Sequence, residues 1–203
     1  TKNVTSFGVI GLSENTVYYF QVIAMDSSNN KTAYTTNNKK TLNINDPVIN
    51  NTSITIDSVT ETTMTVSWFA ATDDITPQAN LQYALFRSLS NNVATSSSAE
   101  ANGTKILDYS TNVLTSNVSG LSAGTQYWFN VVVMNGNAKK TPYSPKQQTT
   151  LDTTSPVVAT KTLTVANVKE TSMTISWTRA SDAVSTQSSL SYRLVMSTNS
   201  TAN

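Results

Sequence analysis

The only adjacent pair of carboxylates in the chain is Asp73-Asp74, and a further aspartate, Asp182, follows in a similar local sequence. Clustered carboxylate oxygens can bind calcium, and two carboxylates that flank a bond can act as general acid and base. Adjacent residues in a turn rarely converge on one bond, and no Asp-x-Asp-x-Asp-Gly loop is present. We therefore expect these aspartates to cap a solvated turn, with calcium binding as the alternative.

The composition removes most other chemistry. The 203 residues include no His and no Cys, which excludes a Ser-His-Asp triad, a thiol nucleophile and thiolate metal ligands. The net charge of +1 gives no electrostatic attraction to nucleic acid. No apolar run approaches the ~18 residues of a membrane span. We expect a non-catalytic chain with no cofactor, no metal, no nucleic-acid partner and no membrane insertion in this segment.

The chain repeats itself at a constant offset. The segment ETTMTVSWFAATDD (61–74) returns as ETSMTISWTRASDA (170–183). Residues 1–94 align with residues 110–203 without a gap, with 33 identities in 94 pairs. Position 1 corresponds to position 110, so the repeat is 109 residues long. It exceeds the roughly 20–50 residues of a solenoid unit and fits whole domains in a row.

Short segments with period-two alternation and β-branched or aromatic residues predict strands. They are SITIDSV (53–59), TTMTVSW (62–68), LQYALF (81–86) and TQYWFNVVVM (125–134). Turn residues such as Asp46-Pro47 and Asn135-Gly136-Asn137 separate them. The one helical segment that we expect is a single turn in SSSAEANG (96–103). The pattern predicts an all-β sandwich.

Alternation also assigns faces to the long strand at residues 125–134. Tyr127 and Phe129 begin the set expected in the core, whereas Trp128 and Val132 point the other way. The residues that we predict to form the structural core are Trp68, Trp177, Tyr18, Tyr127, Tyr83 and Tyr192.

These residues resemble the fibronectin type III domain. That family has a Trp on the second strand, a Tyr on the third, and then Leu-x-x-x-Thr-x-Tyr-x-Phe-x-Val, which here starts at Leu12 and again at Leu121. The resemblance implies tandem seven-stranded, immunoglobulin-like β-sandwiches, with Tyr18 and Tyr127 as tyrosine corners whose hydroxyls bond to nearby backbone. The run at residues 68–83 is similar to the variety found in long bacterial surface proteins. The integrin-binding Arg-Gly-Asp tripeptide of the family is absent.

The repeat predicts three parts. Residues 45–152 form a complete module, residues 1–44 match the C-terminal half of a module, and residues 153–203 match the N-terminal half of a further one. Two explanations of the halves remain open. The chain is a window cut from a longer array, or the front half of one chain completes the back half of the next. We expect self, as neighbouring modules or chains, as a partner, besides an unknown surface ligand.

The expected function is that of a non-catalytic extracellular array: the stalk, fibre or adhesin shaft of a bacterial surface protein or filament, self-assembling head-to-tail or laterally. Low charge and the lack of oxidisable thiols suit a secreted or cell-surface location. Short, proline-containing linkers at residues 45–47 and 153–156 favour an extended rod. The alternative is a set of spacer modules in a secreted carbohydrate-active enzyme.

The face away from the core carries a candidate interaction surface, which we call the outer stripe. Its residues are Tyr19, Ile23, Met25, Phe86, Trp128, Val132 and Met134. An exposed apolar patch that recurs in every repeat suits lateral pairing of like rods. The strand propensity of aromatic and β-branched residues is the alternative explanation.

Overall fold

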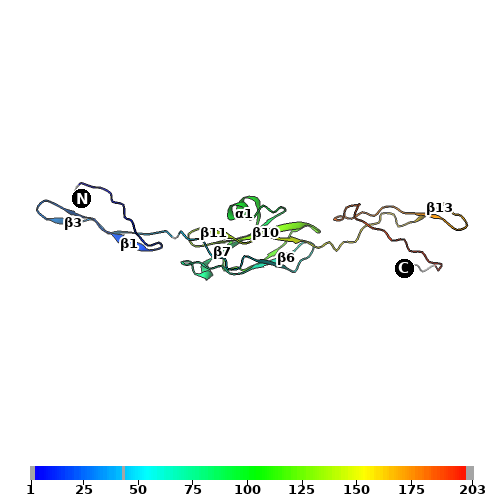
Figure 1. The fold of residues 1–203 in the computed structure, drawn as a ribbon, viewed down its shortest axis with the longest axis horizontal. Helices are drawn as coiled ribbons and strands as arrows, with labels where there is room; N and C mark the ends of the chain where they lie inside the picture. Colours follow the sequence, from blue (N-terminus) through cyan, green and yellow to red (C-terminus); the bar gives the residue numbers. More distant parts are fainter. Residues whose placement is uncertain (1–2, 43, 200–203) are drawn as a thin grey trace.

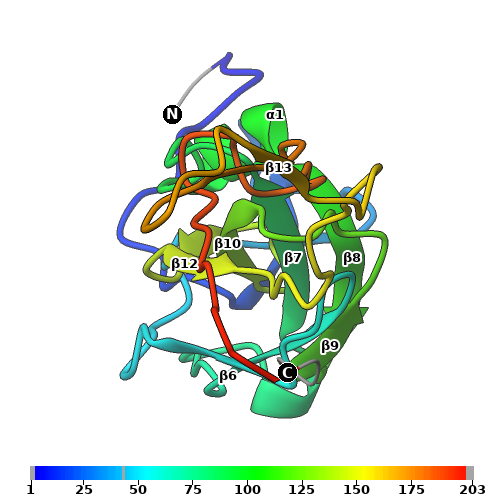
Figure 2. The ribbon, with the colours of Figure 1, turned by 90° about the vertical axis from the view of Figure 1, so that its right-hand side faces the viewer.

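The structure, a computed structural model, describes residues 3–42 and 44–199. Its elements form three bodies in a row, with a dense central body and an open, extended segment at either end (Figure 1). Viewed along the long axis, the C-terminal segment lies in front of the central body (Figure 2). None of the helices in the described residues is long and apolar enough to cross a membrane.

The central body consists of two antiparallel sheets. Its elements are β5 (Ile54–Asp57), β6 (Met64–Trp68), η1 (Gln78–Asn80), β7 (Gln82–Ser88), α1 (Ser96–Asn102), β8 (Thr104–Thr111), β9 (Thr115–Val118), β10 (Gln126–Met134), β11 (Lys140–Pro142) and β12 (Lys146–Thr149). One sheet has the order β5-β6-β9, and the other has β11-β10-β7-β8, with β12 also paired to β10. Pro145 separates β11 from β12, because a proline nitrogen cannot donate to the ladder. With β11 and β12 as one interrupted edge strand, three strands face four, as in a fibronectin type III domain.

The end segments carry only two-stranded ladders. Their elements are β1 (Val17–Phe20), β2 (Ile23–Met25), β3 (Lys31–Ala33), β4 (Asn37–Lys40), β13 (Thr164–Ala166) and β14 (Thr174–Ser176). The pairs are β1 with β4, β2 with β3, and β13 with β14, all antiparallel. Among the described residues of these segments, Ala180 is the one buried apolar residue.

The core lies between the two sheets of the central body. Trp68, Tyr83 and Tyr127 are 5%, 0% and 5% exposed, and they belong to one buried cluster. The ring centroids of Trp68 and Tyr83 lie 6.2 Å apart, within the range of favourable aromatic contacts. On β10 the inward residues Phe129 and Val131 are fully buried in the same cluster, as the alternation of side chains requires.

The core predicted for the end segments is not closed. Trp177 and Tyr192 are 42% and 44% exposed, and Tyr18 is only partly buried. Their rings still make the local contacts of the pattern, since Trp177 and Tyr192 lie 5.8 Å apart. The reason for the exposure is that the described residues of each segment form only part of a sandwich, and they include no second sheet over these rings.

The outer face of β7 and β10 is also buried, contrary to the prediction from alternation. Phe86 and Val132 of the outer stripe are 1% and 0% exposed, because Val93 and Ala99 pack over them. Trp128 is partly buried against the same cluster. The loop that contains Val93 and the helix α1 therefore bury the outer face of the sheet, which the alternation pattern predicted to be exposed to solvent.

The start and the end of α1 follow from local chemistry. The Thr95 side chain accepts a hydrogen bond from the Ser98 backbone, and the Ser98 side chain accepts one from the Thr95 backbone, which forms a capping box. At the other end, a Cβ on Gly103 would lie 2.6 Å from the Ala99 carbonyl oxygen and 2.9 Å from Phe86 Cβ. Only glycine fits where the chain leaves the helix this close to the sheet.

Polar contacts fix α1 and the preceding loop to the sheet. Glu100 Oε1 accepts hydrogen bonds from the Tyr109 hydroxyl at 2.8 Å and from Lys140 Nζ at 2.5 Å. The Lys140 ammonium holds the pKa of the Glu100 carboxyl below its usual value. Asn130, buried on β10, donates from Nδ2 to the Val93 carbonyl at 2.6 Å. These bonds cross from the sheet to both covering segments.

Replacement of Trp68 by Ala should lower the free energy of unfolding of the central body by about 3–5 kcal/mol, because it empties an enclosed site. Trp177→Ala is the matched control, since the same residue at the equivalent position is half exposed. It should change that free energy by less than about 0.5 kcal/mol. Urea denaturation followed by circular dichroism measures both, and equal losses would contradict the assignment of the core.

Candidate functional site at the junctions between the bodies

Asp73 caps the turn between β6 and β7. Its Oδ1 accepts the backbone N–H groups of Ile75 and Thr76 at 3.1 and 2.7 Å, and its Oδ2 accepts Asn135 Nδ2 at 2.9 Å. Partial burial raises the pKa of Asp73, but these hydrogen bonds outweigh it, and the pKa lies below its usual value. The carboxylate therefore has the turn-capping role expected from the sequence.

The same turn recurs at the equivalent position of the next repeat. Asp182 Oδ1 accepts the backbone N–H groups of Val184 and Ser185 at 2.9 and 2.6 Å. These backbone hydrogen bonds lower the pKa of the Asp182 carboxyl, and the one from Ser185 contributes most. In the described residues, no group of three or more acidic side chains is placed to hold a metal ion.

Asn45 joins the N-terminal segment to the central body, and we call residues 44–47 the N-terminal junction. Asn45 Nδ2 donates to Glu14 Oε1 at 3.0 Å and to Asp74 Oδ2 at 2.7 Å. The Asn45 carbonyl accepts Asn135 Nδ2 at 3.0 Å. Asp73 and Asp74 thus accept from different groups and do not converge on one bond.

Glu61 holds the other linker, residues 151–156, which we call the C-terminal junction. Glu61 Oε1 accepts Thr153 N–H at 2.8 Å, the Thr153 hydroxyl at 2.7 Å and the Thr154 hydroxyl at 3.2 Å. The Thr153 hydroxyl makes the largest contribution to a lowered pKa of the Glu61 carboxyl. Sequence reasoning missed this residue, because Glu61 and Thr153 are 92 positions apart.

Gly124 of the central body lies against Val184 of the segment that follows it. Its φ is +57°, and a Cβ at this position would lie 2.0 Å from Val184 Cγ1. A residue with a side chain at position 124 would therefore have to displace the Val184 side chain and adopt a backbone conformation that favours glycine.

Both junctions bring together the same two loops. Glu14 and Gly124 lie in the loops before β1 and β10, while Asp74 and Val184 lie in the turns that follow β6 and β14. At the N-terminal junction Asn45 bridges this loop and this turn through Glu14 and Asp74, and at the C-terminal junction Gly124 of the loop lies against Val184 of the turn. The candidate functional feature of the chain is thus a contact that aligns successive bodies.

Tyrosine corners hold the loops that reach these junctions. The Tyr127 hydroxyl accepts Ser122 N–H at 3.0 Å, and the Tyr18 hydroxyl accepts Ser13 N–H at 2.9 Å. Thr150 adds a second brace, because its hydroxyl donates to the Ser122 carbonyl at 2.6 Å. These bonds fix the loop that carries Gly124.

The outer stripe is not a recurring surface. Tyr19, Ile23 and Met25 are 72%, 58% and 59% exposed in the N-terminal segment. In the central body Phe86 and Val132 are buried, and Trp128 and Met134 are partly buried. The prediction of a patch exposed in every repeat is therefore wrong, because α1 and the loop before it cover the central copy.

Comparison with known proteins gives a family and one curated relative. The family described as the purple acid phosphatase N-terminal domain matches residues 49–151. Exoglucanase B of Cellulomonas fimi is 30% identical over 193 residues, which is 90% of this chain. The chain spans only 16% of the length of that relative.

Solved structures with a similar fold include the FN1-FN3 domains of chicken CNTN1 and the third fibronectin III domain of human KIAA0343 protein. The first is 16% identical, with a TM-score of 0.44, and the match covers 70% of this chain and 45% of that one. The second is 19% identical, with a TM-score of 0.39, and covers 55% of this chain and 89% of that one.

Asp73→Ala should lower the free energy of unfolding of the central body by about 1–3 kcal/mol near neutral pH, because two backbone N–H groups and Asn135 lose their acceptor. The contribution is complete above the ordinary pKa of 3.8 and is lost as the pH falls through the lowered folded-state value. The difference between the variant and the parent should therefore shrink below pH 3.8. Asp182→Ala is the control, and an equal effect from it would refute the assignment.

Glu61→Ala should loosen the C-terminal junction while the melting temperature of the central body changes little. The chain has no Cys, so spin labels can be attached to single cysteines introduced on each side of residues 151–156. Pulsed electron resonance should show a broader distance distribution in the variant than in the parent. Glu170→Ala, the equivalent position away from this linker, should leave the distribution unchanged. Identical distributions for Glu61→Ala and the parent would show that the Glu61 contacts do not restrict motion.

Proposed function

The chain belongs to the family of the purple acid phosphatase N-terminal domain, and we propose that it acts as a non-catalytic, extracellular rod of tandem fibronectin type III modules. In this role the rod keeps other parts of a larger protein at a set distance. Residues 45–152 are one complete module under this proposal, and the segments on either side belong to its neighbours.

The observation that carries the proposal is the pair of junctions. Asn45 lies in the first linker and donates hydrogen bonds to residues on both sides of it, at 3.0 and 2.7 Å. Glu61 lies in the central body and accepts hydrogen bonds of 2.7–3.2 Å from residues of the second linker. Pro47 and Pro156 stiffen the same linkers. Because each junction joins equivalent loops, every further module extends the line in the same way.

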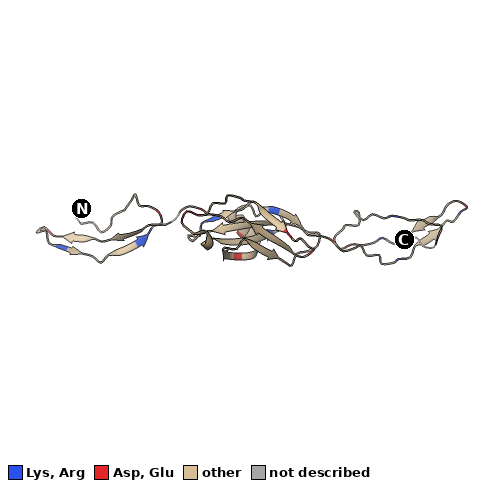
Figure 3. Cartoon of the chain, turned by 90° about the horizontal axis from the view of Figure 1, so that it is seen from below, with Lys and Arg blue, Asp and Glu red and all other residues tan. Residues whose placement is uncertain are grey.

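The charge distribution agrees with a passive spacer. Charged residues make up 12% of the chain, and they are scattered along all three bodies (Figure 3). A rod with a net charge of +1 has little long-range attraction for nucleic acid or for an anionic surface. The surface therefore suits separation of other domains better than capture of a charged partner.

Two settings fit such a rod: the shaft of a bacterial surface protein or filament, and a spacer in a secreted carbohydrate-active enzyme. A specific observation supports the second setting. The match to the exoglucanase covers 90% of this chain, and it therefore has to include both junctions. A larger protein with a catalytic domain beside this chain supports the enzyme setting, whereas further copies at the same repeat spacing support the shaft.

Deletion of residues 46–154, one repeat of the chain, should bring the flanking parts of the full-length protein closer together by about 35–40 Å. This length follows from strands of about ten residues at ~3.3 Å each, plus loops. Negative-stain electron microscopy with labelled flanks measures the separation. An unchanged separation, or hydrolysis of cellulose or of a phosphate monoester by the purified chain, would contradict the proposal.

A further inference from the structure

The first and the last stretch of the central body run along it in the same direction. Residues 47–57 lead from the N-terminal junction through β5, and residues 140–151 lead through β11 and β12 to the C-terminal junction. The contacts at their ends fix this direction, because Asn135, just before β11, bonds to Asn45, and Glu61, just after β5, bonds to Thr153. The chain thus enters the body at one end and leaves it at the other (Figure 1).

Hydrogen bonds join the two stretches at two places in the half of the body next to the N-terminal junction. The Thr141 hydroxyl donates to the Pro47 carbonyl at 2.6 Å. Further along, Ser144 N–H donates to the Thr52 carbonyl at 3.1 Å, and the Ser144 hydroxyl donates to the Thr52 hydroxyl at 2.9 Å.

A third connection lies near the C-terminal junction. Leu151 N–H donates to the Thr60 carbonyl at 3.0 Å, directly before Glu61 binds the following linker. The partners advance together along both stretches, from the Pro47 bond to the Thr60 bond. The connections are therefore spread over the length of the body.

Each stretch is also held to the rest of the sandwich. Val48 and Thr72 exchange two backbone hydrogen bonds, of 2.7 and 2.9 Å, and Pro47 is buried. Tyr143, which is 2% exposed, donates its hydroxyl to the Phe69 carbonyl at 2.5 Å. Neither stretch is a loose end of the chain.

Tension along the rod acts on the three connections in shear. A pull at the two junctions draws residues 47–57 towards one end of the body and residues 140–151 towards the other. Because the stretches run in the same direction, this pull slides one along the other and loads all three connections together. A single hydrogen bond contributes little to stability, so the resistance is large only where several bonds have to break at once.

We propose that these paired stretches form a clamp, centred on residues 47–52 and 141–144, through which the central body bears tensile load along the rod. This inference rests on the proposed rod and adds a function to it, because keeping domains apart requires no resistance to pulling. Such load arises when the two flanks of the rod are attached to objects that move apart.

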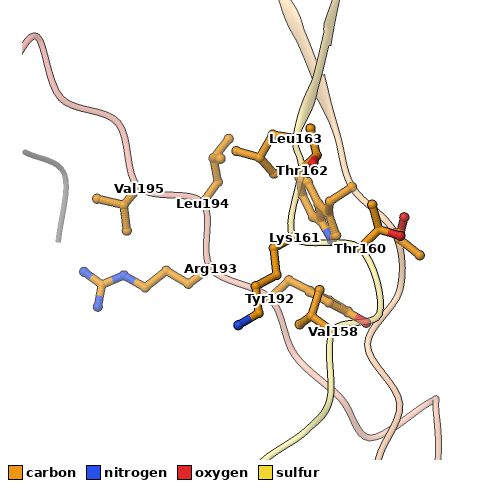
Figure 4. A pocket seen from close by; sticks show the side chains of 11 residues that line it. Val158, Thr160, Lys161, Thr162, Leu163, Tyr192, Arg193, Leu194 and Val195 are labelled. Atoms are coloured by element: carbon orange, nitrogen blue, oxygen red, sulfur yellow. The ribbon is translucent and has the colours of Figure 1, made fainter. Parts of the chain in front are cut away.

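The C-terminal segment contains one part of the clamp. Val157 and Ser181 exchange backbone bonds of 2.7 and 2.9 Å, as Val48 and Thr72 do. In the described part of this segment, residues 158–163 face Tyr192 across an open hollow of about 380 Å³ (Figure 4), with no second stretch bonded alongside. Force applied across the central body alone therefore measures the clamp.

Single-molecule force spectroscopy of the full chain tests the proposal. The chain has no Cys, so handles can be attached through Asp46→Cys and Asp152→Cys, at two exposed positions. Unfolding should then release about 340 Å of chain, from ~3.6 Å per residue less the folded length. Handles at Asp46→Cys and Asn137→Cys lie at the same end of the body and peel the connections apart one after another. This second direction should require clearly less force.

Thr141→Val and Thr115→Val form a matched pair, because each keeps a β-branched side chain and removes one hydroxyl hydrogen bond. Forced unfolding is governed by the unfolding rate. At constant force between positions 46 and 152, Thr141→Val should unfold about fivefold faster than the parent, because a clamp bond is lost. Thr115→Val, whose bond to Ser67 lies outside the clamp, should unfold at the parent rate.

Equal unfolding forces in the two directions, or equal unfolding rates of Thr141→Val and Thr115→Val, would each overturn the clamp. Urea denaturation of both variants shows whether they are folded at the start. The spacer function is measured by the separation of the flanking parts at rest, so a failed clamp and a failed spacer give different results.

Discussion

The rest of the structure depends on one packing constraint: the aromatic cluster between the two sheets is buried only where both halves of a sandwich surround it. Trp68 and Tyr83 are removed from water only because residues 112–151 supply the remaining strands around them. Trp177 and Tyr192 have the same types, spacing and a similar ring contact, yet they stay half exposed. At about 25 cal/mol per Å² of buried apolar area, this enclosure gives the central body several kcal/mol that the described residues of either end segment do not gain by themselves.

The junctions depend on that enclosure. Tyr127 is anchored in the core by its ring, and its hydroxyl fixes the loop that carries Gly124 towards the next body. Asn135 leaves the end of β10 and reaches both the Asp73 turn and the Asn45 linker. Packing within one body therefore sets the positions of the polar groups that contact the neighbouring bodies, which is the physical basis for the proposed rod.

Alternation and β-branched residues were enough to predict the strands around Trp68, Tyr83 and Tyr127 and the inner face of β10. The place of the helix was also predicted, but α1 has seven residues, about two turns, where a single turn was expected. The burial of the outer face of β7 and β10 could not be predicted in this way. Val93 and Ala99 bury it, and their placement depends on long-range hydrogen bonds such as the one from Asn130 to Val93. β8 and β9 escaped prediction because their side chains alternate poorly between apolar and polar. The junction bonds join residues up to 93 positions apart, and local pattern carries no signal for them.

Hydrogen–deuterium exchange of the dilute full chain, read by mass spectrometry, tests the central claim most directly. If a sandwich closes only when both halves are present, the amides of β6, β7 and β10 should exchange slowly, while those of β1 and β14 should exchange nearly as fast as in an unfolded chain. Slow exchange in β1 and β14 at concentrations where the chain is monomeric would contradict the account, because it would mean that half a sandwich protects itself.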